Sequence, residues 1–138
     1  MAGYSGTPLV RKLGIKPGHQ MLVIHAPASY WDWISPLPEG AVLKKTPKEQ
    51  SVDFVHVFVK ERKEYEKEVL RQKKALKMDG MIWISWPKKS SKVPTDLDEN
   101  IIRDFALKNG LVDVKVCAVD EVWSGLKLVI PVKDRGKS

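Results

Sequence analysis

The sequence has one cysteine, Cys117, and no long hydrophobic run. A single thiol excludes an internal disulfide framework and any metal site built from several cysteines, which fits a reducing compartment. The longest strongly apolar runs are about five residues, whereas a transmembrane helix needs roughly 18. The first residues also lack the basic segment and apolar stretch of a secretory signal. We therefore expect a cytoplasmic protein that has no membrane partner.

The sequence also has fewer acidic than basic residues: 17 Asp and Glu against 24 Lys and Arg, which gives a net charge of +7. Such an excess favours anionic partners, including nucleic acid. Hydrophobic residues make up 43% and charged residues 30% of the 138 positions, which is typical of a folded domain and not of a disordered chain. We expect one domain over residues 1–138, with an extended segment at 1–6 and a flexible tail at 133–138. This length leaves little room for a separate substrate-binding lid.

Strand signals recur along the chain as short runs of apolar and β-branched residues. The run at 21–25 suits a strand buried on both faces and is predicted to be the central strand. The run at 53–59 is the strongest of these signals and should also lie inside the sheet. A turn at Asp79-Gly80 is predicted to lead into another strand. The remaining strands are expected at 42–45, 81–86, 113–119 and 126–132, and the last two should form an antiparallel hairpin.

Three helices are predicted between these strands. The first covers residues 7–14, where Thr7 can cap the helix and Gly14 ends it. The second covers residues 60–77, where charge dominates and a narrow apolar stripe marks one buried edge. The third starts at Thr95 or Asp96 as its cap and ends at Gly110.

Strand and helix alternate through most of the chain, which favours a parallel sheet covered by helices on both faces. The predicted fold is a small doubly wound, mostly parallel Rossmann-like α/β sheet with a C-terminal antiparallel hairpin. Ligands of such sheets bind beyond the carboxyl ends of the strands, where the strand order reverses. In this sequence those ends fall at residues 25–27, 60–62 and 86–89.

Two stretches, LGIKPGHQMLVIHAP and LKMDGMIWISWPKKS, are followed by a capped helix, Gly110 and the terminal hairpin. This order resembles a shortened class I methyltransferase, whose cofactor is S-adenosylmethionine. The family carries glycines directly after the first strand, whereas this chain has His25-Ala26-Pro27-Ala28. The family also ends its second strand with an acidic residue that holds the ribose, whereas this chain has Lys44 and Lys45. These departures argue against S-adenosylmethionine, and the cofactor stays open.

A second resemblance rests on three separated motifs, GYSGTPLVRKLGIKPG, WISWPKKSS and LVDVKVCAVDEVWSGLKLV. They resemble a family of short uncharacterised bacterial proteins, a domain of unknown function. This resemblance covers nearly the whole chain. It implies a single-domain bacterial protein with no assigned reaction, so whether the chain is an enzyme stays open.

The segment after the strand at 81–86 is the first candidate binding site. Trp86 is followed by Lys88 and Lys89 and by two serines, which together offer positive charge and hydrogen-bond donors to a phosphate. The alternative is a solvated basic loop whose tryptophan packs in the core. No Walker or GxGxxG pattern is present, so the two standard phosphate loops are excluded.

The start of the chain is the second candidate, since Tyr4, Ser5 and Thr7 precede a helix N-terminus that could receive an anion. The same residues can simply cap that helix. At the other end of the sequence, Glu121 and Trp123 lie in the hairpin connection. Glu121 could pair with the lysines at 88 and 89, or both residues could serve turn geometry and packing.

His25 is the one histidine at a predicted strand end. Histidine transfers protons near neutral pH, which makes His25 a candidate acid or base, although a structural hydrogen bond is the alternative. His56 lies within an apolar strand and is expected to be a core residue. No HxxxH pair or other ligand spacing is present, so no metal site is predicted. Cys117 lies within a strand and should be an unreactive buried thiol.

Three functions remain open. The first is binding of a small anionic or nucleotide-like ligand at the carboxyl edge of the sheet. The second is binding of nucleic acid or an acidic protein through the helix at 60–77, although glutamates interrupt its basic residues and concentrate positive charge only in its last turns. The third is an interaction module, a homodimer for example, on a degenerate methyltransferase-like fold.

Overall fold

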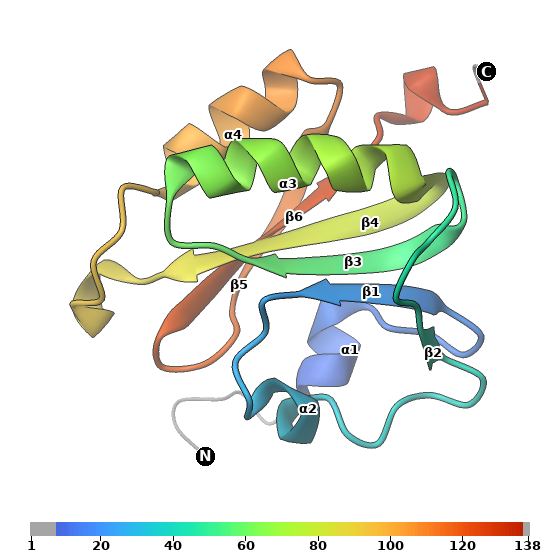
Figure 1. Ribbon diagram of the computed structural model, residues 1–138, viewed down its shortest axis with the longest axis horizontal. Coiled ribbons are helices and arrows are strands. Elements are labelled where there is room, and N and C mark those ends of the chain that lie inside the picture. The colour runs from blue at the N-terminus through green and yellow to red at the C-terminus, as the bar shows by residue number, and fades with distance from the viewer. Residues whose placement is uncertain (1–7, 137–138) are drawn as a thin grey trace.

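The computed structural model describes residues 8–136 and contains a six-stranded sheet with helices on both faces (Figure 1). The strands are β1 (Gln20–Ile24), β2 (Val42–Leu43), β3 (Val52–Phe58), β4 (Leu76–Pro87), β5 (Val112–Ala118) and β6 (Trp123–Val129). The helices are α1 (Leu9–Leu13), α2 (Tyr30–Trp33), α3 (Arg62–Ala75) and α4 (Glu99–Lys108), with 3-10 turns η1 (Lys89–Ser91) and η2 (Val132–Asp134).

The strands lie in the order β2-β1-β3-β4-β6-β5. The first four of these are parallel, while β6 runs antiparallel to β4 and β5 antiparallel to β6. The predicted fold class, a mostly parallel Rossmann-like sheet with a C-terminal antiparallel hairpin, is confirmed. The strand order reverses between β1 and β3, since the chain adds β2 on one side of β1 and all later strands on the other.

The prediction that the first strand is central is wrong. On its outer side β1 pairs only with the two-residue strand β2, through Gln20 with Val42 and Met21 with Leu43. The middle of the sheet belongs to β3 and β4. A short apolar run shows that both faces of a strand are covered, but it does not show how many strands lie beyond it.

Two layers of apolar side chains sandwich the sheet. On one face, Val55 and Val57 of β3 pack with side chains of α3 and α4. On the other face, Phe54 and Phe58 pack with α1 and α2, together with the indole of Trp83. Alternate residues of one strand thus enter opposite cores, which explains why residues 53–59 are apolar almost without interruption.

The predicted turn at Asp79-Gly80 does not exist. Helix α3 ends at Ala75, and β4 starts at Leu76 and continues through Gly80 to Pro87, although its pairing with β3 shifts register between Leu76 and Met81. A Cβ atom at Gly80 would lie 2.7 Å from Cδ1 of Leu76 and 3.0 Å from the carbonyl oxygen of Val52. The glycine is therefore explained by close packing within the strand and not by a turn.

The cap of α4 is also shifted from the prediction. Asp98 is the N-cap, and its Oδ1 accepts a hydrogen bond from the Ile101 amide at 2.8 Å. Thr95 donates to the carbonyl of Lys60 at 2.5 Å, and Asp96 accepts from the Arg62 amide at 2.7 Å. These two residues, predicted as caps of α4, instead fasten the loop after β4 to the start of α3.

His56 lies fully buried in β3, as expected for a core residue. Its Nδ1 is 2.9 Å from the hydroxyl of Tyr30, and its Nε2 is 2.7 Å from the hydroxyl of Ser85. The ring stacks on Phe58 with centroids 4.3 Å apart. Burial lowers the pKa of His56 to about 3, so the imidazole is neutral in the folded protein over the whole physiological range.

This burial predicts an acid-dependent loss of stability. In the unfolded chain His56 takes up a proton as the pH falls through 6.5, whereas in the folded protein it does so only near pH 3. Between those values the free energy of unfolding should fall by up to about 1.4 kcal/mol per pH unit from this residue. Urea denaturation from pH 7 to pH 4.5 measures the slope, and His56→Gln should flatten it. The control His25→Gln, which changes an exposed histidine, should keep it, and an unchanged slope in His56→Gln would contradict the assignment.

Candidate functional site

The candidate site is a hollow of about 380 Å³ at the carboxyl edge of the parallel strands. It lies where β1 and β3 end, which is where the strand order reverses. His25 follows β1, Lys60 follows β3, and Glu64 belongs to the first turn of α3. The residues that line the hollow are His25, Pro27, Phe58, Lys60, Glu64 and Trp123.

One wall of the hollow is polar and charged. The Nδ1 atom of His25 lies 3.2 Å from Oε2 of Glu64. His25 is 54% exposed and Glu64 36% exposed, so this pair is open to solvent and contributes little to stability. Lys60 is exposed and lines the same hollow. The wall therefore offers a cation, an imidazole and a carboxylate within one small volume.

The other wall is aromatic. Trp123 is half-buried and meets the ring of Phe58 edge to face, with centroids 5.1 Å apart and ring planes at 86°. Phe58 is itself buried against the ring of His56. The Asp120 side chain accepts hydrogen bonds from the amides of Val122 and Trp123 at 2.9 and 2.8 Å, which fixes the turn that precedes β6. A local turn therefore sets the direction from which the indole enters the hollow.

The structure brings together two of the residues proposed from sequence, His25 and Trp123, although they are far apart in the chain. Tyr4, Ser5 and Thr7 lie outside the described residues.

The lysine segment after β4 does not line the hollow. The Trp86 side chain is only 7% exposed and packs in the core that α3 and α4 cover. Lys88 donates its backbone N–H to the carbonyl of Val122 at 2.7 Å, and Lys89 begins the turn η1. Glu121 is exposed, and among the ion pairs of residues 8–136 none joins it to either lysine.

Phe58, Lys60 and Glu64 were not among the candidate binding residues, although residues 60–62 were recognised as a strand end. Lys60 had a usable signal, because it directly follows the strongest strand and so falls at the carboxyl edge. Glu64 had none, since nothing in its sequence context separates it from the other glutamates of the helix. Its position in the first turn of α3, facing the end of β1, is a tertiary property.

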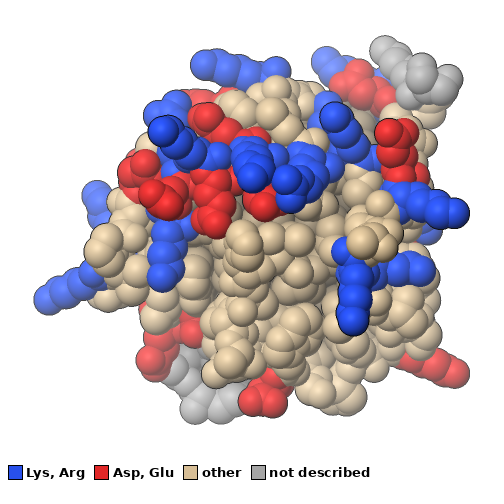
Figure 2. All heavy atoms as spheres, viewed as in Figure 1, with Lys and Arg blue, Asp and Glu red and all other residues tan. Residues whose placement is uncertain are grey.

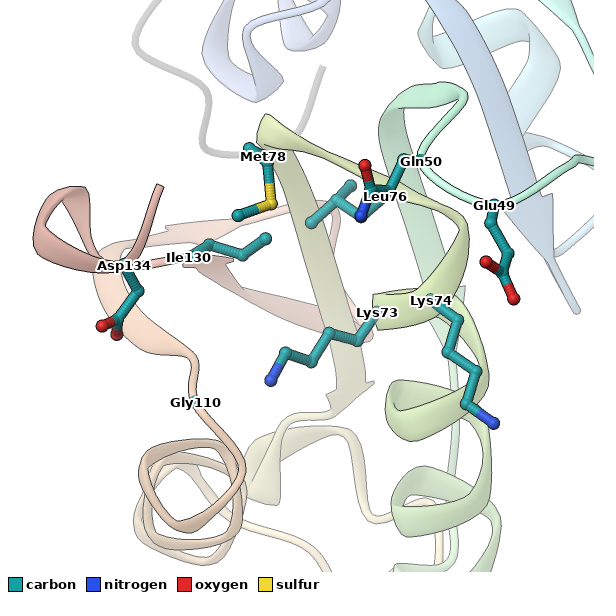
Figure 3. A pocket seen from close by; sticks show the side chains of 9 residues that line it. All are labelled: Glu49, Gln50, Lys73, Lys74, Leu76, Met78, Gly110, Ile130 and Asp134. Carbon is teal, nitrogen blue, oxygen red and sulfur yellow. The ribbon is translucent and has the colours of Figure 1, made fainter. Parts of the chain in front are cut away.

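A second hollow, of about 450 Å³, lies at the opposite edge of the sheet between the end of α3, Gly110 and the segment after β6 (Figure 3). Its two lysines do not converge, because Lys73 points toward Gly110 while Lys74 points away from it. The Lys73 ammonium donates to the carbonyl of Asn109 at 2.6 Å, next to the last turn of α4. These cations do not form a common site for an anion.

The loop after β1 does not fit S-adenosylmethionine in the way that the methyltransferase resemblance implies. His25 has a φ of +60°, a conformation that favours glycine, so the backbone turns here with a full side chain in place. That imidazole lines the hollow, and Pro27 beside it has no N–H to offer a ligand. At the end of β2, Lys44 and Lys45 stand where a carboxylate would be needed for the ribose hydroxyls.

Within residues 8–136 no three His, Cys, Asp or Glu side chains gather in a way that could hold a metal ion. No helix in that range has both the length and the apolar character to cross a bilayer.

The fold is similar to that of several solved methyltransferases. A SAM-dependent methyltransferase from Aquifex aeolicus has a TM-score of 0.67 and 14% identity, over 89% of this chain and 88% of that chain. The ribosomal protein L11 methylase from Lactobacillus delbrueckii subsp. bulgaricus has a TM-score of 0.57 and 10% identity, over 88% and 74%. The structure of a DhpI-SAH complex has a TM-score of 0.62 and 10% identity, over 91% and 83%.

Sequence comparison adds no family assignment, because no protein-family model and no curated protein matches the chain. At these identities the structural likeness concerns the fold alone. The chain therefore has a Rossmann-like fold of the class I methyltransferase type, with six strands within residues 8–136.

Proposed function

We propose that the hollow beside His25 binds a small nucleotide-like molecule, with a planar ring and an anionic group, and that the chain works as a ligand-binding domain. The observation that carries the proposal is the meeting of Lys60, Glu64 and His25 with an aromatic wall at the switch point of the sheet. Open α/β sheets bind their ligands at this point. The proposal concerns binding and assigns no reaction.

The chemistry of the two walls supports this class of ligand. A planar base can stack on an indole such as that of Trp123, which lines the hollow, a contact worth about 1 to 3 kcal/mol per base in nucleic-acid proteins. The Lys60 ammonium can receive a phosphate as a charge-assisted partner. The Glu64 carboxylate can accept hydrogen bonds from ribose hydroxyls.

One structural neighbour supports the class of ligand, a nucleoside, but not its identity. DhpI, which shares the fold, was solved with SAH, a nucleoside that carries a charged amino-acid tail. The fold thus accommodates a ligand of this size and chemistry. Because the glycine loop and the ribose carboxylate are replaced here, we expect a nucleoside monophosphate to bind in preference to SAH.

The first test uses AMP as the probe and SAH as the comparison ligand, which should bind more weakly. AMP at a hundred times its dissociation constant should stabilise the folded protein by about 2.7 kcal/mol, which appears as a rise in the melting temperature. Lys60→Gln should weaken AMP binding in calorimetry by about tenfold or more, because a charged hydrogen-bond partner is lost. The matched control Lys63→Gln removes an equal charge from the exposed side of α3 and should leave the affinity within twofold. No thermal shift with AMP at millimolar concentration, or equal effects of the two variants, would contradict the proposal.

The second test uses His25→Gly. The substitution relieves a strained backbone but adds chain flexibility and removes a solvent-exposed pair, so the free energy of unfolding should change by less than about 1 kcal/mol. Affinity for AMP should nevertheless fall severalfold, because the imidazole lines the hollow. Calorimetry and urea denaturation measure the two effects, with Ala28→Gly in the same loop as the control. Full AMP affinity in His25→Gly would remove His25 from the site.

A further inference from the structure

Four lysines gather on the face of the sheet that α1 covers, and their positions in the sequence give no hint of this. Lys12 belongs to α1, Lys16 lies in the turn that follows it, Lys115 belongs to β5, and Lys127 belongs to β6. We propose that this lysine face, made of Lys12, Lys16, Lys115 and Lys127, binds the phosphate backbone of a nucleic acid. It is a surface separate from the hollow at the carboxyl edge.

Strand register and one hydrogen bond bring the lysines together. Lys115 and Lys127 are paired across β5 and β6, and residues paired in this way point to the same face of a sheet. Lys127 is paired in turn with Trp83 of β4, whose indole packs beneath α1 in the core of that face. The Lys115 ammonium reaches the carbonyl of Lys12 at 3.2 Å, which links β5 to the end of α1.

The position of α1 is itself fixed. The indole N–H of Trp83 donates to the carbonyl of Leu13 at 2.8 Å in the buried core. Gly14, with φ at +81°, ends the helix. The helix therefore cannot carry Lys12 away from the strands without breaking buried contacts, and the lysine face is preorganised.

The charge of Lys127 lies close to those of Lys115 and Lys16. None of the ion pairs found in the described part of the chain includes Lys16, Lys115 or Lys127. Burial lowers the pKa of Lys127, and repulsion from Lys115 and Lys16 lowers it further, with no acidic residue among the causes. An anion placed here would relieve this repulsion, which is the condition for a favourable electrostatic contact with phosphate.

Helix α3, which sequence reasoning considered for nucleic-acid binding, has a different surface. Arg62 pairs with Glu66 and Arg71 with Glu68, each within one helical turn. Figure 2 shows blue and red side chains interleaved over this helix. Two of its cations are therefore met by its own glutamates, whereas no ion pair of residues 8–136 includes Lys16, Lys115 or Lys127.

The test is the affinity for a labelled single-stranded RNA of 20 nucleotides, measured by fluorescence anisotropy between 50 and 200 mM salt. The variant Lys16→Gln/Lys115→Gln/Lys127→Gln removes three charges from the lysine face. Its matched control, Lys63→Gln/Lys67→Gln/Lys108→Gln, removes three exposed charges from α3 and α4. Thermal unfolding of both variants checks the fold. The lysine-face variant loses repulsion but also the hydrogen bond from Lys115 to Lys12, so its melting temperature should stay close to that of the parent.

We expect the lysine-face variant to bind at least tenfold more weakly, and the control to stay within threefold. Each lost phosphate contact lowers the salt slope by about 0.7 for a single strand, so the slope should fall by about 2 in the lysine-face variant. Undetectable RNA binding at 50 mM salt, or equal losses in the two variants, would overturn the proposal. Competition by polyglutamate as strong as that by unlabelled RNA at equal charge would also overturn it, in favour of an acidic protein partner. AMP binding in the hollow is independent of all these outcomes.

Discussion

The fold depends on the burial of residues 54–58 of β3 and 82–87 of β4 between two helical layers. These strands have no solvent face, so every side chain in their middle must enter one of the two cores. A polar side chain can be buried here only if its polar atoms have hydrogen-bond partners. His56 meets that condition through the hydroxyls of Tyr30 and Ser85. With this centre fixed, parallel pairing places the ends of β1 and β3 side by side at one edge. The candidate site is a consequence of that pairing.

The fold matches the methyltransferase type, but the site does not, and the difference is confined to a few residues. The sheet order, the switch point and the terminal hairpin follow the methyltransferase type. The loop after β1 keeps a backbone conformation suited to glycine but carries the imidazole of His25. An architecture can persist while the side chains at its ligand edge change, because the edge contributes little to the buried core. This separation is why the fold alone does not assign a reaction to the chain.

The net positive charge has a similarly uneven distribution. On α3 the cations have acidic neighbours one turn away, which is a local property of a helix. On the other face of the sheet, lysines from a helix, a turn and two strands lie together with no carboxylate in ion-pair contact with Lys16, Lys115 or Lys127 in residues 8–136. A sum over the sequence counts both surfaces equally, although they differ in how closely cations and carboxylates are interleaved.

The sequence by itself determined the elements and the fold class, because apolar periodicity and helix punctuation are local signals that the core enforces. It also placed His25 among the candidate residues, since strand ends can be recognised in the sequence. Trp123 was a candidate too, but it begins β6 and does not lie in the connection where the sequence placed it. The sequence misplaced the central strand, the start of β4 and the cap of α4. These features depend, in that order, on the pairing of β1 with Val42, the packing of Gly80 on Leu76 and the hydrogen bond from Ile101 to Asp98. Only the tertiary structure decided that Lys60 and Glu64 join the hollow and that Trp86 does not, because pairing across the sheet and the packing of helices are relations between distant residues.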